Sequence, residues 1–317
     1  MSEQAIRASG LTKRFDATTA VDGVTLSIAT GSVYGLIGPN GAGKTTTFSM
    51  LAGYLRPTEG SVQVLGFAPP AVDALRGRLG VLPQDAVLPP TDMVGELLVH
   101  LARLQGLRAD KALEAAHVAL DEVAGGAWWS QRCGSLSHGM AKRVALAQAF
   151  LGAPEVVLLD EPTAGLDPRV AWEMRQLIKA KTGLGGQRTI VISSHNLQEL
   201  EEICDAAAIL DRGRLVASGS MAELTAANEE VRIELAPGTR RGTERGQVPL
   251  APIRDLPTVS SVDLDDERCQ LVITVKRQQA DAETVIGQVL LILLQNEVRI
   301  SGVSKGRGLE QRVMDLT

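Results

Sequence analysis

The sequence predicts an α/β protein built on a largely parallel sheet. Short apolar runs typical of buried strands alternate along the chain with longer segments whose apolar residues recur at helical spacing. The glycine-rich stretch GPNGAGKT (38–45) directly follows one such run, VYGLI (33–37), and opens a helical segment. A strand that ends in a glycine loop and continues into a helix is a recurring unit of parallel α/β sheets.

The remaining elements of this core follow in order. Alternating or continuous apolar residues predict strands within 11–37 and at 61–66, 79–84, 155–161 and 188–195. Apolar residues at helical spacing predict helices over 45–55, 91–107, 110–123 and 140–151. The segment AAAILDRGRLVASG (206–219) is typical of a hairpin that turns at Arg212-Gly213.

The character of the sequence changes near residue 226, which divides the chain into domains 1–225 and 226–317. In the second domain we expect strands at 231–235, 269–275 and 298–304 and helices at 283–297 and 308–316. The stretch 236–257 is rich in Gly, Pro and Arg and is interpreted as a loop. These elements predict a small α+β domain at the carboxyl end.

The composition favours a packed globular protein without a strongly basic face. Of the 317 residues, 44% are hydrophobic, and the formal net charge is −5. Proteins that bind duplex nucleic acid usually present a basic surface, so no nucleic-acid partner is expected.

The cysteines and apolar runs argue against a disulfide framework and a membrane span. Cys133, Cys204 and Cys269 form no CxxC pair, so neither a zinc site nor a disulfide framework is indicated. The first ten residues have no apolar core of the kind that a secretory signal needs. The run 285–294 is about 15 Å long as a helix, too short to cross a bilayer. A membrane role is therefore expected to come through a partner chain.

The loop at 38–45 matches the phosphate-binding pattern G-x-x-x-x-G-K-[ST] in full. Glycines let backbone N–H groups wrap phosphates, and the following helix start adds partial positive charge. Lys44 is expected to reach the β- and γ-phosphates, and Thr45 to ligate Mg²⁺. The sequence thus predicts ATP and Mg²⁺ as cofactors.

Two carboxylates follow the strand VVLLD (156–160). Ligands of open α/β sheets bind at the carboxyl ends of strands, so Asp160 is expected to hold Mg²⁺ directly or through water. Glu161 is placed to orient or deprotonate an attacking water. The alternative for Glu161 alone is a solvated carboxylate after a strand.

The stretch LSHGM (136–140) precedes a helical segment. Ser137 is a good helix N-cap, and a hydroxyl, a glycine and a helix start also make an anion cradle. These two interpretations are compatible.

The order of these motifs carries a family resemblance. GPNGAGKT, Gln84, LSHGM, LLDEP, AGLD and His195 occur in the order seen in ATP-binding cassette (ABC) ATPases. The resemblance covers about residues 1–225. It implies a P-loop NTPase fold, with a RecA-like core and a helical subdomain at about 85–150.

The resemblance also implies roles for single residues. It assigns catalysis to Glu161, His195, Gln84 and Lys44. It assigns Mg²⁺ to Thr45, Gln84 and Asp160. It assigns nucleotide binding to Phe15, Val21, Gly38, Pro39, Asn40, Gly41, Ala42, Gly43, Lys44, Thr45, Thr46, Ser137 and Gly139.

In ABC ATPases, the signature of one subunit contacts the γ-phosphate held by the other subunit, so a head-to-tail homodimer with a second copy of this chain is implied. The commonest signature is LSGGQ; here His138 replaces a glycine and Met140 the glutamine, while Ser137 and Gly139 are kept. His138 is interpreted as a tolerated surface side chain, with a pH-sensitive contact as the alternative.

The carboxyl-terminal domain indicates a subgroup within the ABC family. The domain after residue 226, ending in GLEQRVMDLT, is similar to the extension of ATPase subunits of ABC-2-type exporters. This implies separately encoded permease subunits, docking near residues 85–93, and a place at the cytoplasmic face of the membrane. The carboxyl-terminal domain is hypothesised to be a dimerisation or regulatory domain.

Three alternatives remain open at the level of sequence. One is an ABC ATPase that drives a cell-envelope or motility machine without transport. Another is a soluble ABC ATPase that acts on nucleic acid or ribosomes, and the third is an importer ATPase. A heterodimer is likewise an alternative to the homodimer.

Overall fold

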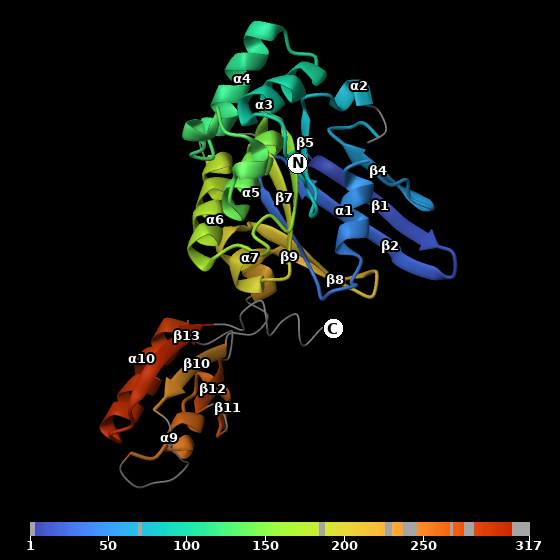
Figure 1. Cartoon of the computed structure of the whole chain (residues 1–317). Helices are drawn as coiled ribbons and strands as arrows, with labels where there is room; N and C mark the ends of the chain where they lie inside the picture. Colours follow the sequence, from blue (N-terminus) through green and yellow to red (C-terminus); the bar gives the residue numbers. More distant parts are fainter. Residues whose placement is uncertain are drawn as a thin grey trace. The chain divides into compact units, whose positions relative to one another are not determined.

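The structure is a computed structural model that describes residues 4–68, 72–183, 188–225, 230–236, 246–266, 269–275 and 282–305. The chain forms two compact units, with the division between Met221 and Ala222 (Figure 1). Each unit has a hydrophobic core of its own. The helix expected at 308–316 and residues 237–245 of the expected loop lie outside the described residues.

The first unit is organised around a six-stranded sheet with the order β5-β6-β7-β3-β8-β9. Its strands are β3 (Val33–Ile37), β5 (Leu79–Leu82), β6 (Val156–Asp160), β7 (Thr189–Ser194), β8 (Ala206–Asp211) and β9 (Arg214–Ser220). All neighbours pair in parallel except β8 and β9, which form the expected hairpin. Every residue of β3, β6 and β7 is buried, as continuous apolar strands in a covered sheet require.

A second, antiparallel sheet in this unit has the order β2-β1-β4. It contains β1 (Gln4–Phe15), β2 (Thr18–Ala29) and β4 (Glu59–Val64). Helix α1 (Lys44–Leu51) contributes Phe48, Met50 and Leu51 to a core that includes residues of both sheets. The α/β prediction is confirmed, and the antiparallel sheet is an addition that strand periodicity alone did not reveal.

Helices α3 (Val94–Leu104), α4 (Ala109–Asp121) and α5 (His138–Phe150) contact one another. In Figure 1, α4 lies at the side of this unit away from the antiparallel sheet, with α3 next to it. The ring of Trp129 stacks on His117 with centroids 3.6 Å apart. The chain therefore has helices within the 85–150 segment for which a helical subdomain was expected.

The sequence analysis did not predict α2 (Val72–Leu75), α6 (Pro168–Gly183), α7 (Leu197–Ile203) or α8 (Met221–Thr225). Helix α6 carries charged residues among its apolar ones, so its stripe is weak, and α7 has only two turns. Helix α6 follows the polar segment after β6, and α7 follows the polar segment after β7.

The second unit has the chain order β10 (Glu230–Leu235), α9 (Leu250–Arg254), β11 (Val259–Asp265), β12 (Gln270–Val275), α10 (Ala282–Gln295) and β13 (Ile300–Lys305). Its sheet order is β11-β12-β10-β13, and all pairs are antiparallel. This is the βαββαβ topology of ferredoxin-like domains.

Two expectations for this unit need correction. The stretch 236–257 is not wholly a loop, because α9 lies within it. Its Pro252 is in the first turn, where proline is tolerated. Strand β11, VSSVDLD, was missed because its serines and aspartates are typical of loops, although Val259, Val262 and Leu264 are buried.

Candidate functional site

The glycine loop 38–45 connects β3 to α1. Gly43 is the N-cap of α1, with φ 94°, and no side chain caps the helix start. A Cβ atom on Gly43 would lie 2.6 Å from the carbonyl oxygen of Ala20, so only glycine fits there. The first N–H groups of α1 therefore have no side-chain cap and suit a phosphate group.

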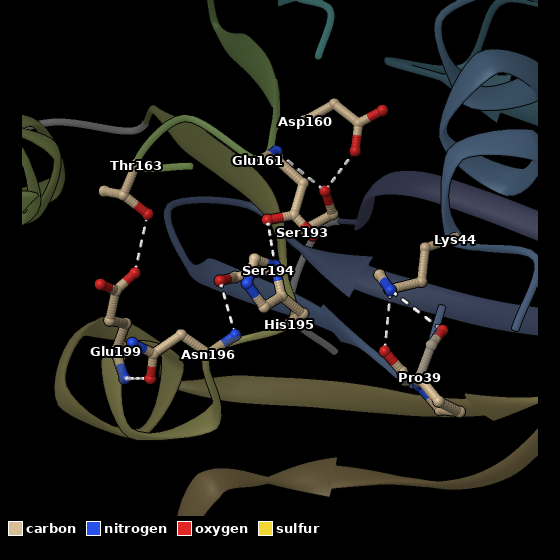
Figure 2. A network of polar contacts seen from close by, with 11 residues as sticks. Pro39, Lys44, Asp160, Glu161, Thr163, Ser193, Ser194, His195, Asn196 and Glu199 are labelled. Atoms are coloured by element: carbon tan, nitrogen blue, oxygen red, sulfur yellow. Dashed lines mark hydrogen bonds and ion pairs between the residues drawn. The ribbon is translucent and has the colours of Figure 1, made fainter. Parts of the chain in front are cut away.

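Lys44 is curled over this loop. Its Nζ donates hydrogen bonds to the carbonyl oxygens of Gly38 (2.7 Å) and Pro39 (3.1 Å), as Figure 2 shows. Burial lowers the pKa of Lys44, while the charges of Glu161 and Asp160 raise it. An ammonium group held by two carbonyls over a phosphate loop is placed to exchange those carbonyls for phosphate oxygens.

Asp160, the last residue of β6, is 3% exposed. Burial raises the pKa of its carboxyl above the usual value, and this effect outweighs the hydrogen bonds from Ser193 and Thr45, which act to lower the pKa. The hydroxyl of Ser193 donates to Oδ1 of Asp160 and accepts from the backbone N–H of Glu161 at 3.0 Å (Figure 2). The register explains this contact, because Asp160 on β6 is paired directly with Ser193 on β7.

Glu161 follows β6 in the left-handed backbone region, with φ 49°. Its Oε2 lies 2.8 Å from Nδ1 of His195, which follows β7. The Glu161 side chain is 8% exposed and the His195 side chain 61%. The pair thus places a buried carboxylate beside an imidazole at the surface, both just past the carboxyl ends of neighbouring parallel strands.

These residues fit ATP with Mg²⁺. Thr45, at the start of α1, lowers the pKa of Asp160, at the end of β6, and both residues offer oxygen groups of the kind that Mg²⁺ prefers. Among the described residues, no group of three or more His, Cys, Asp and Glu side chains could hold a metal ion. Mg²⁺ sites with one or two protein ligands are usual when the ion is shared with phosphates.

Gln84 lies two residues beyond β5, the strand next to β6, and is exposed. Its carbonyl oxygen accepts a hydrogen bond of 3.2 Å from Nζ of Lys142 on α5. Gln84 is thus joined to the helix that follows the LSHGM stretch.

Ser137 is the N-cap of α5, and its hydroxyl accepts from the N–H of Met140 at 3.3 Å, which confirms the capping interpretation. Gly139 faces Val170 of α6, since a Cβ atom there would lie 3.3 Å from Cγ1 of that valine. The exposed His138 lies close to Gly165. The structure joins Ser137 to its own helix, and not to the Glu161–His195 pair.

The two residues expected at the adenine differ in exposure. Phe15 ends β1, is 45% exposed and has Nζ of Lys13 5.2 Å from its ring centroid. Val21 is fully buried and packs near Gly43, so in this structure it supports the glycine loop and presents no surface to a nucleotide.

The remaining residues assigned to nucleotide binding lie in the loop and at the start of α1. Pro39, Asn40, Gly41 and Thr45 are exposed, Thr46 is half-buried, and Gly38 and Ala42 are buried.

Three further residues of this region escaped the sequence analysis: Ser193, Lys142 and Glu199. Ser193 carries a signal in the sequence. It lies two residues before His195, and two serines at the end of an otherwise apolar buried strand indicate polar partners at that end. Lys142 and Glu199 lie on polar helix faces that carry no such signal.

The comparisons with known proteins agree with this arrangement. The family model described as ABC transporter matches residues 21–164. Over 222 residues the chain is 37% identical to the daunorubicin/doxorubicin resistance ATP-binding protein DrrA of Streptomyces peucetius, covering 70% of this chain and 67% of that protein. It is 36% identical over 221 residues to the Nod factor export ATP-binding protein I of Burkholderia pseudomallei (strain 1710b), covering 69% and 72%.

Solved structures show the same fold. The chain is similar to cbiO1 of Clostridium perfringens, part of the ABC transporter complex cbiONQ, with 27% identity and a TM-score of 0.63 over 71% of this chain and 92% of that one. An ATP-binding subunit of an ABC transporter gives the same identity and TM-score over 70% and 92%. No helix among the described residues is long and apolar enough to span a bilayer. The extent of these matches shows that the chain belongs to the ABC transporter family, as one of its ATP-binding subunits, which bind ATP with Mg²⁺ and hydrolyse it to power transport.

Proposed function

We propose that this chain is the ATPase subunit of an ABC-2-type membrane exporter, in which two copies close around ATP and move a separately encoded permease. Two of its relatives are named for drug resistance and for Nod factor export. The observation that carries the proposal is the 2.8 Å contact between Glu161 and His195 beside a complete phosphate loop. The assignment of export, as distinct from ATP hydrolysis, is inferred from the names of these relatives.

The proposed chemistry follows from the groups at the sheet edge. Bound Mg²⁺ supplies positive charge to the β- and γ-phosphates. Thr45 and Asp160 would hold it, with Gln84 as a further oxygen ligand. Lys44 leaves its loop carbonyls for the phosphates. The buried carboxylate of Glu161 orients a water and accepts its proton, while His195 holds that carboxylate and faces the γ-phosphate from the open side.

Each site is completed by a second copy of the chain. Ser137 and Gly139 stand at the start of α5, where a helix N-terminus favours an anion. In the proposed head-to-tail homodimer, this helix start of one copy contacts the γ-phosphate held by the other copy's loop. ATP thus joins the two copies, and hydrolysis releases them.

The proposed permease contact lies in the first unit, between strand β5 and helix α3. A groove of about 450 Å³ is lined by Tyr54, Leu75, Leu101 and Leu104 among others. Tyr54 and Leu104 are each 64% exposed, and Val87, in the 85–93 segment, is 86% exposed. A groove with exposed apolar side chains, lined on one side by Leu79, Gly80 and Val81 of β5, suits a short helix of a membrane subunit, which would place the chain at the cytoplasmic membrane face.

The carboxyl-terminal unit is proposed to be an accessory domain that sets the rest geometry of the two copies. Its core is separate from that of the first unit. Ferredoxin-like domains serve many functions, so the topology alone assigns none.

Mixing two inactive variants tests the composite site. Lys44→Ala removes the phosphate contact, and Ser137→Asp keeps a capping oxygen while placing negative charge against the γ-phosphate. Each variant alone should be nearly inactive. An equal mixture should regain about a quarter of wild-type turnover, since half of the dimers are mixed and each of these has one intact site of two.

Failure of the mixture to regain activity, with both variants folded and dimeric, would contradict the composite site. Export is tested separately by purifying the chain with its membrane partner and measuring ATP-dependent efflux from cells that express both. Recovery of nucleic acid or ribosomes in place of a membrane protein would contradict the exporter proposal.

A further inference from the structure

The loop from Glu161 to Asp167 joins the catalytic carboxylate to the start of α6. The N–H of Ala164 donates to the carbonyl of Glu161 at 3.2 Å, and the N–H of Leu166 donates to the carbonyl of Thr163 at 3.3 Å. Glu161 has a left-handed backbone, which is rare for a residue with a side chain. Such a conformation persists only when its surroundings hold it, so the contacts of this loop bear on where Glu161 points.

One carboxylate outside the known motifs holds this loop. Oε2 of Glu199, on α7, accepts a hydrogen bond of 2.7 Å from the hydroxyl of the buried Thr163. Oε1 of Glu199 accepts one of 2.8 Å from Arg175 on α6. The side chains of Arg175 and Glu199 are 13% and 15% exposed. A pair this sheltered is screened less by water than a surface pair, and its geometry is correspondingly firm.

Glu199 also belongs to the segment that carries the histidine. Its N–H donates to Oδ1 of Asn196, which caps α7 directly after His195. Thr163 lies two residues after Glu161, and Glu199 lies four residues after His195. The Thr163–Glu199 bond therefore crosses between the same two segments as the Glu161–His195 contact (Figure 2).

We propose that Glu199 is a positioning residue for ATP hydrolysis. By binding Thr163 and Arg175 together, it holds the loop 161–167 against α7 and so keeps Glu161 at hydrogen-bond distance from His195. The inference rests on the proposed catalytic roles of Glu161 and His195. Glu199 would then affect only one of two steps. The glycine loop and Lys44 bind ATP without Glu199, while hydrolysis depends on Glu199.

The consequence is a loss confined to turnover. Losing the Thr163 hydroxyl, or the charge of Glu199 that binds it, weakens a buried hydrogen bond and frees the loop that sets the direction of Glu161. Misplacement of a catalytic group by about 1 Å can cost up to about a hundredfold, and a partial loss of about tenfold in kcat is expected here. The KM for ATP should stay within about twofold, because the phosphate contacts are unchanged.

The experiment uses the full-length protein with ATP and Mg²⁺. Thr163→Val removes the hydroxyl and keeps the shape, Thr163→Ser keeps the hydroxyl, and Glu199→Gln removes the charge. Thr163→Val and Glu199→Gln should each lower kcat about tenfold at an almost constant KM, and Thr163→Ser should retain near wild-type kcat. The double variant should lose less than the product of the two single losses, because both variants weaken the contact between Thr163 and Glu199.

Glu202→Gln is the matched control. Glu202 lies on the same helix and binds the same Arg175 at 3.0 Å, but it is more exposed. Its other carboxylate oxygen accepts from Gln176, whereas the Thr163 hydroxyl donates to Glu199. It should turn over ATP as the wild type does. If Thr163→Val keeps wild-type kcat, or if Glu202→Gln loses as much as Glu199→Gln, the positioning role is refuted and the network is general packing between α6 and α7. If Glu161→Gln remains active, the catalytic assignment fails and the inference with it, whereas an inactive Glu161→Gln beside a fully active Glu199→Gln overturns the inference alone.

Discussion

The Nδ1 atom of His195 lies 2.8 Å from Oε2 of Glu161, and the carboxylate is buried while the imidazole is mostly exposed. The contact joins residues that directly follow two neighbouring parallel strands. It places the proposed proton acceptor, Glu161, and its histidine partner at the edge of the sheet where the glycine loop begins.

Replacing Glu161 by Gln keeps its size and removes the charge that would accept a proton. We expect kcat to fall by at least about a hundredfold, with ATP still bound and dimer accumulating in its presence. Phosphate release, ATP titration and size-exclusion chromatography measure the three effects. Glu155→Gln, at the other end of β6, is the control and should be active. Wild-type turnover by Glu161→Gln would show that another group activates the water.

Ser193→Ala removes the hydroxyl that orients Asp160 and accepts from the N–H of Glu161. Loss of a group that orients a metal ligand typically weakens metal affinity about tenfold or more, so a correspondingly higher Mg²⁺ concentration should be needed for half-maximal activity. ATPase rates across a Mg²⁺ titration measure this shift. Ser194→Ala is the control, because its hydroxyl binds the N–H of Asn196 and not Asp160. Equal Mg²⁺ requirements of the two variants would argue against a role for Ser193 at the metal.

Gly43→Ala should abolish ATP binding or destabilise the loop. The added methyl would meet the Ala20 carbonyl at 2.6 Å, and the residue would keep a φ of 94°. Gly41→Ala separates these two causes, since Gly41 also has positive φ (83°) but nothing lies within 4 Å of its missing Cβ. Backbone strain alone costs about 1–2 kcal/mol, so Gly41→Ala should be milder in both melting temperature and ATP affinity. If the two variants behave alike, the close approach to Ala20 is unimportant.

Phe15→Ala should raise the Kd for ATP about tenfold, because stacking of a base on an aromatic ring contributes roughly 1–3 kcal/mol. The exposed ring at the end of β1 offers its face, which Lys13 now covers in part. Phe15→Tyr should bind as the wild type does. Phe67, a surface aromatic that is 41% exposed beside Arg78, supplies the control Phe67→Ala. Unchanged ATP affinity in Phe15→Ala would place the adenine elsewhere.

The sequence alone determined the α/β class, the largely parallel pairing of apolar strands and the residues of the phosphate loop. It could do so because these features are local: a strand, a glycine turn and a helix start need only neighbouring residues. The same holds for the cap at Ser137, whose hydroxyl oxygen lies only three residues from its donor, the N–H of Met140. Strand β11 and helix α9 were missed, because their residues have turn-like composition and their burial comes from packing in the second unit.

Tertiary structure alone decided which polar groups meet. Asp160 and Ser193 are 33 residues apart, and only the register of β6 against β7 makes them neighbours. Thr163, Arg175 and Glu199 lie on a loop and two helices that sequence patterns did not connect. Periodicity shows which face of an element is buried, but the pairing of side chains from separate elements depends on the register and packing of the whole sheet.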